Sequence, residues 1–154
     1  RSFDLTATVT TEKHDEGVLF STGTENSGIS IFIQKERLVV DYNAFDNHSV
    51  VTSTVEVPAG DSTLRAQFRR LKEGGEIKIY INGELSGSVE VPLFMRMISS
   101  VGSSIGYDHG SAVSSQYESP FPFAGKLHQI EIQLAAKRAP DADEAQARAE
   151  NARQ

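Results

Sequence analysis

The acidic residues of this sequence lack the strand-borne pair that glycoside hydrolysis requires. Glycosidases flank the scissile bond with two carboxylates, and on a β-strand two such residues share one face only when they are two positions apart. The nearest match, Ile130-Glu131-Ile132-Gln133, carries a single carboxylate. We therefore expect the chain to have no glycosidase activity of its own.

The residues that support nucleophilic or zinc chemistry are also missing or badly spaced. The chain has no cysteine, which excludes disulfides, thiolate nucleophiles and cysteine-based zinc sites. Its four histidines show no His-x-x-x-His spacing, and no nucleophile-elbow motif is present. In the last predicted strand, His128 alternates in step with the apolar residues, which favours a position in or beside the core.

Calcium is the metal ion that the sequence suits best, because oxygen ligands from loops at the rim of a β-sandwich are sufficient to bind it. Asp108, in the Gly-rich stretch Gly106-Tyr107-Asp108-His109-Gly110-Ser111, is the first candidate, with Asp41 and Asp46 as second choices. A capped turn in which Asp108 accepts hydrogen bonds from loop amides is the alternative. No cofactor is required by the pattern, and calcium is an optional one.

Sugar binding would use aromatic faces beside polar groups. Several tyrosines and one phenylalanine fall in or beside predicted loops. Two arginines and a further tyrosine occupy the outward-facing positions of two strands that we expect to be neighbours. A plain solvated sheet face is the alternative for the second group. The candidate ligand-binding residues are Tyr42, Phe45, Arg65, Arg69, Tyr80, Tyr107 and Tyr117.

Period-2 alternation of apolar residues between 2 and 134 predicts the elements that position these side chains. It gives about ten short strands, and Asn82-Gly83 is a strong two-residue hairpin signal. The fold class is therefore all-β, an antiparallel two-sheet jelly-roll sandwich, with a functional candidate in the long loop 106–122. The predicted core comprises Phe3, Leu5, Ile31, Leu64, Phe68, Ile79, Ile81 and Ile130.

A change of composition after residue 134 predicts two parts, a β-sandwich domain over 1–134 and an Ala-rich charged tail over 135–154. Pro140 followed by Asp141, Asp143 and Glu144 is typical of a helix start, so we expect a short helical or flexible tail. It is either a frayed surface helix or a segment that docks on a neighbour.

The net charge of −6 argues against nucleic acid as a partner and suits calcium, neutral sugars or a protein neighbour. No apolar run approaches the roughly 20 residues that span a membrane. The sequence begins at Arg1 without a signal peptide and enters a strand pattern at once, so we expect a piece of a longer polypeptide. Cytoplasmic and exported locations both stay open.

Two groups of motifs carry a family resemblance. The stretch 75–84, a strand ending in Asn82-Gly83, resembles the signature of laminin G-like and concanavalin A-like lectin-type sandwiches. More specifically, the chain resembles the C-terminal β-sandwich domain that follows the catalytic domain in many bacterial arylsulfatases. The matching pieces are Arg1-Ser2, residues 16–19, residues 37–43, Pro58-Ala59-Gly60, Gly106-Tyr107-Asp108 and residues 120–127. The chain departs from the pattern at Ala112 and at Ala44-Phe45-Asp46.

The resemblance implies an accessory domain and not the sulfatase itself. A sulfatase needs a Cys or Ser, converted to formylglycine, four residues ahead of an Arg, and no residue here meets that requirement. The leading hypothesis is a non-catalytic module of a larger bacterial hydrolase, acting in interdomain packing or substrate access with an upstream catalytic domain as partner. The alternatives are a carbohydrate-binding module, with or without calcium, and a glycan-active enzyme on the same fold.

Overall fold

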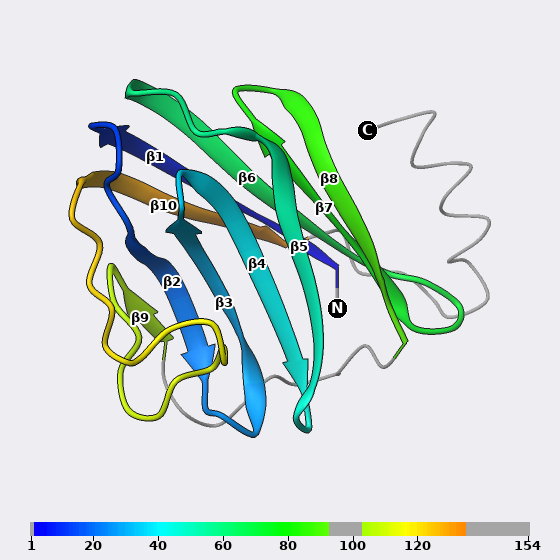
Figure 1. Ribbon diagram of the computed structural model, residues 1–154. Helices are drawn as coiled ribbons and strands as arrows, with labels where there is room; N and C mark the ends of the chain where they lie inside the picture. The colour runs from blue at the N-terminus through cyan, green and yellow to red at the C-terminus, as the bar shows by residue number, and fades with distance from the viewer. Residues whose placement is uncertain (1, 93–102, 135–154) are drawn as a thin grey trace.

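The computed structural model describes residues 2–92 and 103–134, and these form two stacked five-stranded β-sheets (Figure 1). The first sheet has the order β10-β1-β6-β7-β8 and the second has the order β5-β4-β3-β2-β9. The strands are β1 (Phe3–Thr11), β2 (Gly17–Gly23), β3 (Ser27–Gln34), β4 (Arg37–Ala44), β5 (Asn47–Glu56), β6 (Gly60–Arg70), β7 (Gly75–Ile81), β8 (Glu84–Val91), β9 (Ser103–Ile105) and β10 (Lys126–Leu134).

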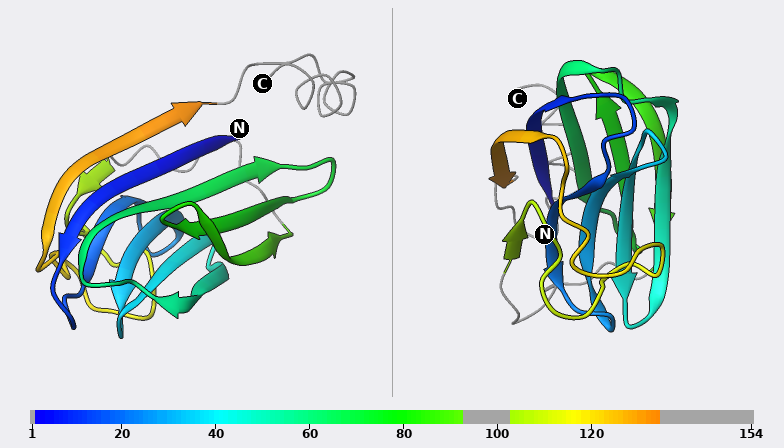
Figure 2. Two further views of the ribbon diagram at one scale, coloured as in Figure 1. Left: turned by 90° about the horizontal axis from the view of Figure 1, so that it is seen from above. Right: turned by 60° about the vertical axis from the view of Figure 1, so that its left-hand side comes forward.

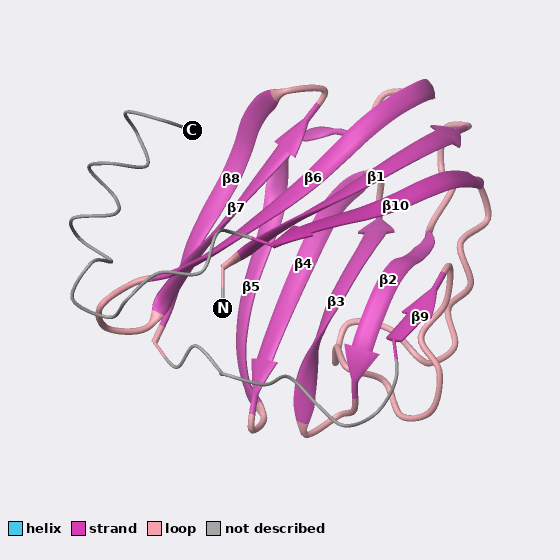
Figure 3. Ribbon diagram, turned by 180° about the vertical axis from the view of Figure 1, so that it is seen from behind, coloured by secondary structure: helices cyan, strands magenta, loops and turns pink. Residues whose placement is uncertain are grey.

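Neighbouring strands within each sheet are antiparallel, which confirms the predicted all-β, two-sheet architecture. Strand β1 pairs with β6 on one side and with β10 on the other, so the first and last described strands lie side by side (Figure 3). The predicted tail, 135–154, lies outside the described residues. Within the described ranges, no helix is long and apolar enough to cross a membrane.

The core lies between the sheets and is formed by the inward rows of the strands. Of the eight residues predicted for it, six are buried, and Phe3 and Ile130 are half-buried and packed against it. This arrangement follows from the period-2 pattern, because alternate side chains of a strand point to opposite faces. The predicted hairpin at Asn82-Gly83 is also present, with φ of 51° and 87° at its two residues.

The predicted position of His128 is wrong because strand β10 does not alternate regularly. A register shift between Thr8 and Val9 leaves Leu127 and Ile130 as the residues of β10 that pack against the core. His128 is exposed, and its Nε2 lies 2.7 Å from Thr10 Oγ1. An extra residue in one strand of a pair moves every later side chain of that strand to the opposite face of the sheet. Counting alternate residues in the sequence does not reveal such a bulge.

Part of the outer face of the second sheet, over strands β2 to β4, is covered by the segment 106–122, which crosses that face in Figure 2. Val18, Phe32 and Val39 form a small outer cluster there, and Tyr117 and Phe121 from the segment pack on it. The Val18 amide donates to the Phe121 carbonyl at 2.9 Å. Strand β4 is consequently buried on both faces, which brings its outward polar residues into the interior.

Candidate functional site

A cavity of about 370 Å³ lies at the rim of the second sheet, where the β2–β3 turn, the β4–β5 hairpin and the segment 106–122 meet. Its lining combines carboxylates, hydroxyls, one side-chain amide and one imidazole with the apolar side chains of Ala112 and Val113. The lining residues are Glu25, Asn26, Asp46, His48, Ala112, Val113, Ser114, Ser115 and Tyr117. We call it the rim cavity.

Asp108 anchors the segment that forms one wall of the rim cavity. Its carboxylate is buried and accepts hydrogen bonds from the Val113 amide at 2.9 Å, from Ser21 Oγ at 3.3 Å and from the Tyr117 hydroxyl. Tyr117 also shares a 2.7 Å hydrogen bond with Ser30 on β3. This is the arrangement that the sequence left open as the alternative to calcium, a carboxylate that holds its own loop together.

A calcium ion bound by Asp108 would have to displace these donors from a side chain that is 1 % exposed. The described residues contain no group of three or more His, Asp or Glu side chains that could hold a metal ion. Calcium binding at Asp108 stays a hypothesis from the sequence, whereas these contacts favour the capped turn, and thermal melting with and without calcium separates the two.

Asn43 ties together the three segments around the rim cavity. It is fully buried, and its Nδ2 donates to the carbonyls of Glu25 at 2.8 Å and Val113 at 3.1 Å. Its Oδ1 accepts from the Asp46 amide at 2.8 Å. Sequence reasoning missed this residue, although a polar side chain inside an otherwise apolar strand was a signal that something covers that face.

Asp41 and His48 form a hydrogen-bonded pair beneath the rim cavity. His48 Nδ1 lies 2.8 and 3.0 Å from the two carboxylate oxygens of Asp41, which is fully buried. Burial raises the pKa of the Asp41 carboxyl above its ordinary value of 3.8, while hydrogen bonds from Ser114 and His48 lower it in part. His48 is 21 % exposed and reaches the cavity surface.

Phe45 is exposed at the tip of the β4–β5 hairpin, directly beside Asp46 of the cavity wall. Its relative exposure is 71 %, the highest of the exposed large hydrophobic residues in the described ranges. Phe45 and Asp46 have φ of 52° and 69°, the left-handed conformation that two-residue hairpin turns demand. Asn, Asp and Gly adopt this conformation most readily, so an aromatic residue here carries a conformational cost without gaining burial.

The remaining candidates in or beside loops lie in different environments. Tyr42 is 1 % exposed, and its ring lies 6.4 Å from that of Phe68, so it belongs to the core. Tyr107 is 44 % exposed and its carbonyl accepts from Ser21. Of the loop aromatics predicted for ligand binding, Tyr117 lines the cavity, and Phe45 is the sequence neighbour of the lining residue Asp46.

Arg65, Arg69 and Tyr80 lie together on the outer face of the first sheet, as predicted. The Arg65 guanidinium carbon lies 4.1 Å from the centre of the Tyr80 ring. Asp4 pairs with both arginines, at 3.3 Å to Arg65 and 2.6 Å to Arg69. Because these groups already satisfy one another, the plain polar sheet face is the simpler interpretation of this surface.

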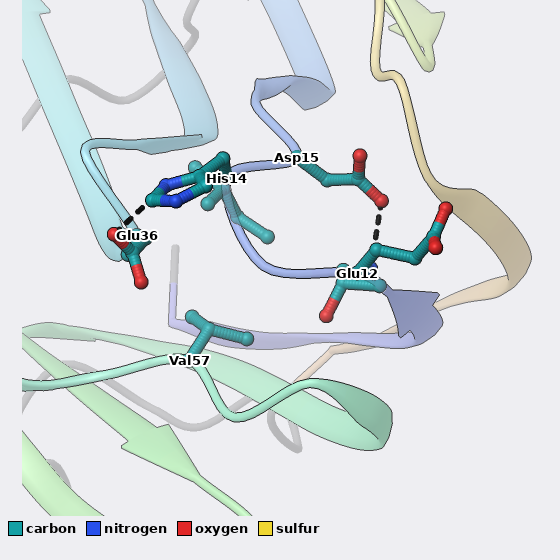
Figure 4. A pocket seen from close by; sticks show the side chains of 7 residues that line it. Glu12, His14, Asp15, Glu36 and Val57 are labelled. Atoms are coloured by element: carbon teal, nitrogen blue, oxygen red, sulfur yellow. Dashed lines mark hydrogen bonds and ion pairs between the residues drawn. The ribbon is translucent and has the colours of Figure 1, made fainter.

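A second, far smaller hollow of about 10 Å³ lies near the β1–β2 and β3–β4 turns (Figure 4). His14 Nδ1 lies 3.1 Å from Glu36 Oε2, and Asp15 accepts from the Glu12 amide at 2.8 Å. This volume holds about one water molecule and no sugar. His14 is 74 % exposed and, like His48, pairs with a carboxylate, which makes it a matched control for His48.

No protein-family model and no curated protein sequence matches the chain. Solved structures do match. Domains LG4-5 of the mouse laminin α1 chain are 15 % identical with a TM-score of 0.68, over 88 % of this chain and 37 % of that one. The CBM40 of the Ruminococcus gnavus IT-sialidase is 15 % identical with a TM-score of 0.60, over 88 % of this chain and 77 % of that one.

The same CBM40 bound to α2,6-sialyllactose matches with a TM-score of 0.57 at 15 % identity, over 94 % of this chain and 80 % of that one. A pentraxin from Limulus polyphemus matches over 66 % of its own length, so the chain spans less than two thirds of it and of the laminin fragment. At these identities the matches show the fold, which is a laminin G-like, concanavalin A-like lectin-type β-sandwich.

Proposed function

We propose that this chain is a lectin-like carbohydrate-binding module and that its ligand site is the rim cavity together with Phe45. The observation that carries the proposal is the exposed aromatic residue held in a left-handed turn beside a polar cavity. Strained or sparsely populated backbone conformations persist where they serve a function. An aromatic ring that gains no burial in the free protein is available to stack on a sugar.

The chemistry of the rim cavity supports a sugar ligand. Sugar rings present an apolar face and a periphery of hydroxyl groups, and the site offers an aromatic ring beside hydrogen-bonding carboxylates, hydroxyls and an imidazole. Its volume of about 370 Å³ falls within the range of roughly 300–1,000 Å³ typical of small-molecule sites. The binding of α2,6-sialyllactose by a CBM40 of the same fold is consistent with this class of function.

The proposal includes no catalytic step and no required metal ion. Glu25 and Asp46 both line the cavity, but a general acid must be protected from solvent to stay protonated, and Asp46 is 83 % exposed. The buried Asp41 is paired with His48 and does not face the cavity as a free acid. The resemblance to the accessory domain of arylsulfatases, with an upstream catalytic domain, remains a hypothesis that rests on sequence motifs alone.

Affinity electrophoresis tests the proposal directly. The protein is run in gels containing neutral polysaccharides (galactan, xylan, mannan, β-glucan) or anionic ones (polygalacturonate, dextran sulfate). Retardation in at least one gel, lost in Phe45→Asn and kept in Leu85→Ala, is the expected result. Leu85 is the matched control because it is an exposed hydrophobic residue, 57 % accessible, on strand β8 of the other sheet.

A further inference from the structure

His48 presents one ring nitrogen to a buried carboxylate and the other to an exposed carboxylate. Nδ1 lies 2.8 Å from Asp41 Oδ1, and Nε2 lies 3.4 Å from Asp46 Oδ1. Asp41 is completely buried, whereas Asp46 is 83 % exposed. One partner of the imidazole is therefore fixed within the fold, while the other can be moved aside by a ligand.

The fixed partner decides which nitrogen faces the rim cavity. An ionised carboxylate only accepts hydrogen bonds, so Nδ1 carries a proton and donates it to Asp41 whenever Asp41 is ionised. Nε2 is then a donor when the ring is charged and an acceptor when it is neutral. Asp41 thus acts as a positioning residue, because it sets the orientation and tautomer of a ring that a ligand would touch.

A hydroxyl group matches Nε2 in either state, because it can both accept and donate a hydrogen bond. A second hydroxyl on the adjacent carbon could donate to the Asp46 carboxylate, the acceptor that lies next to Nε2. A carboxylate or sulfate group could meet only the charged ring. It would also face Glu25 and Asp46 in a cavity whose lining, within the described residues, includes no Lys or Arg.

We propose that the rim cavity selects uncharged sugars and binds them through two adjacent hydroxyl groups, one on His48 Nε2 and one on the Asp46 carboxylate, with Asp41 holding the imidazole in place. This inference rests on the proposed function and names the ligand class of the same site. It is independent of the fold comparisons, since it follows from the contacts of three side chains.

The panel of neutral and anionic polysaccharide gels separates this inference from the proposed function. Retardation only by neutral polysaccharides is expected, with affinity for the retarding polysaccharide reduced about tenfold or more in both His48→Ala and Asp46→Ala. His14→Ala, which removes an exposed histidine that also pairs with a carboxylate, should bind as the wild type does.

Retardation by anionic polysaccharides alone, or neutral binding unaffected by His48→Ala, overturns the ligand class and leaves the proposed function standing. Retardation in no gel refutes the proposed function and this inference with it.

The positioning role of Asp41 has a readout that needs no ligand. Ring ¹⁵N spectra of the free protein, with the His48 signals assigned by their loss in His48→Ala, should show a proton on Nδ1 in the neutral ring. Asp41→Ala should shift His48 toward a mixture of tautomers while the His14 signals stay in place. A neutral His48 protonated on Nε2 in the wild type would contradict the assigned role, whatever the gels show.

Discussion

Removal of the Tyr117 hydroxyl measures how strongly the wall of the rim cavity is held. This hydroxyl donates to the buried Asp108 carboxylate and lies 2.7 Å from Ser30 Oγ. The ring packs edge-on against Phe32, with centroids 5.0 Å apart, and stacks on Phe121 at 5.1 Å. Tyr117→Phe keeps these ring contacts, so the change isolates the two hydrogen bonds.

The expected cost is about 2–4 kcal/mol in the free energy of unfolding. A hydrogen bond to a charged group contributes about 1.5–3 kcal/mol and a neutral one about 1 kcal/mol. Urea unfolding followed by circular dichroism measures the difference, with Tyr107→Phe as the control because Tyr107 is 44 % exposed. A Tyr117→Phe variant within about 0.5 kcal/mol of the wild type would refute the anchoring role, since that is the range of ordinary surface substitutions.

The same variant has an expected pH dependence. Burial raises the pKa of the Tyr117 hydroxyl above its ordinary value of 10.0, and the hydrogen bond to Asp108 adds to this effect. The folded state therefore holds the proton more tightly than the unfolded chain, and this contribution to stability is present below pH 10 and lost as the pH rises further. The stability deficit of Tyr117→Phe should become smaller above pH 10, and a deficit that grows there would contradict the assignment.

Three further predictions follow from the fold and the site. Ile79→Ala, at a fully buried core position, should cost about 2–5 kcal/mol in chemical unfolding, and an unchanged midpoint would contradict the observed packing. The melting temperature in millimolar calcium should equal that in chelator, because the Asp108 carboxylate already accepts three hydrogen bonds within the fold; a rise that Asp108→Asn abolishes would establish a calcium site there. The purified chain should leave chromogenic aryl sulfates and aryl glycosides intact, whereas turnover that survives repurification and is lost in Asp46→Asn would reveal a catalytic role for the cavity.

Strands with one open face were predictable from the sequence, and strands covered on both faces were predictable only in part. Strand β6 alternates apolar and polar residues because its outer face meets solvent, so Leu64 and Phe68 could be assigned to the core. Strand β4 has its outward residues Asp41 and Asn43 fully buried as well. The alternation of side chains along the strand assigns Asp41 and Asn43 to the outer face, but it does not reveal that the segment 106–122 lies over that face.

The site was predicted piecemeal because its contacts join residues far apart in the sequence. Asp108, Phe45 and Tyr117 were each named from residue type and loop position, which local sequence does encode. Their convergence depends on pairs such as Asn43 with Val113, 70 positions apart, and Ser21 with Asp108, 87 positions apart. The arginine and tyrosine group on β6 and β7 was predicted correctly as a neighbouring set. Only the short connection 71–74 joins these two strands, and consecutive strands usually pair, which places Arg65 opposite Tyr80.

The glycan-binding claim is tested most directly by Phe45→Asn in affinity electrophoresis combined with thermal melting. Asn adopts the left-handed conformation more readily than Phe, so the hairpin should be at least as stable as in the wild type while the exposed ring is gone. Glycan binding through Phe45 predicts an unchanged or raised melting temperature together with loss of retardation by the polysaccharide that the wild type binds. Retardation equal to that of the wild type, in a variant that melts at or above the wild-type temperature, would contradict the account.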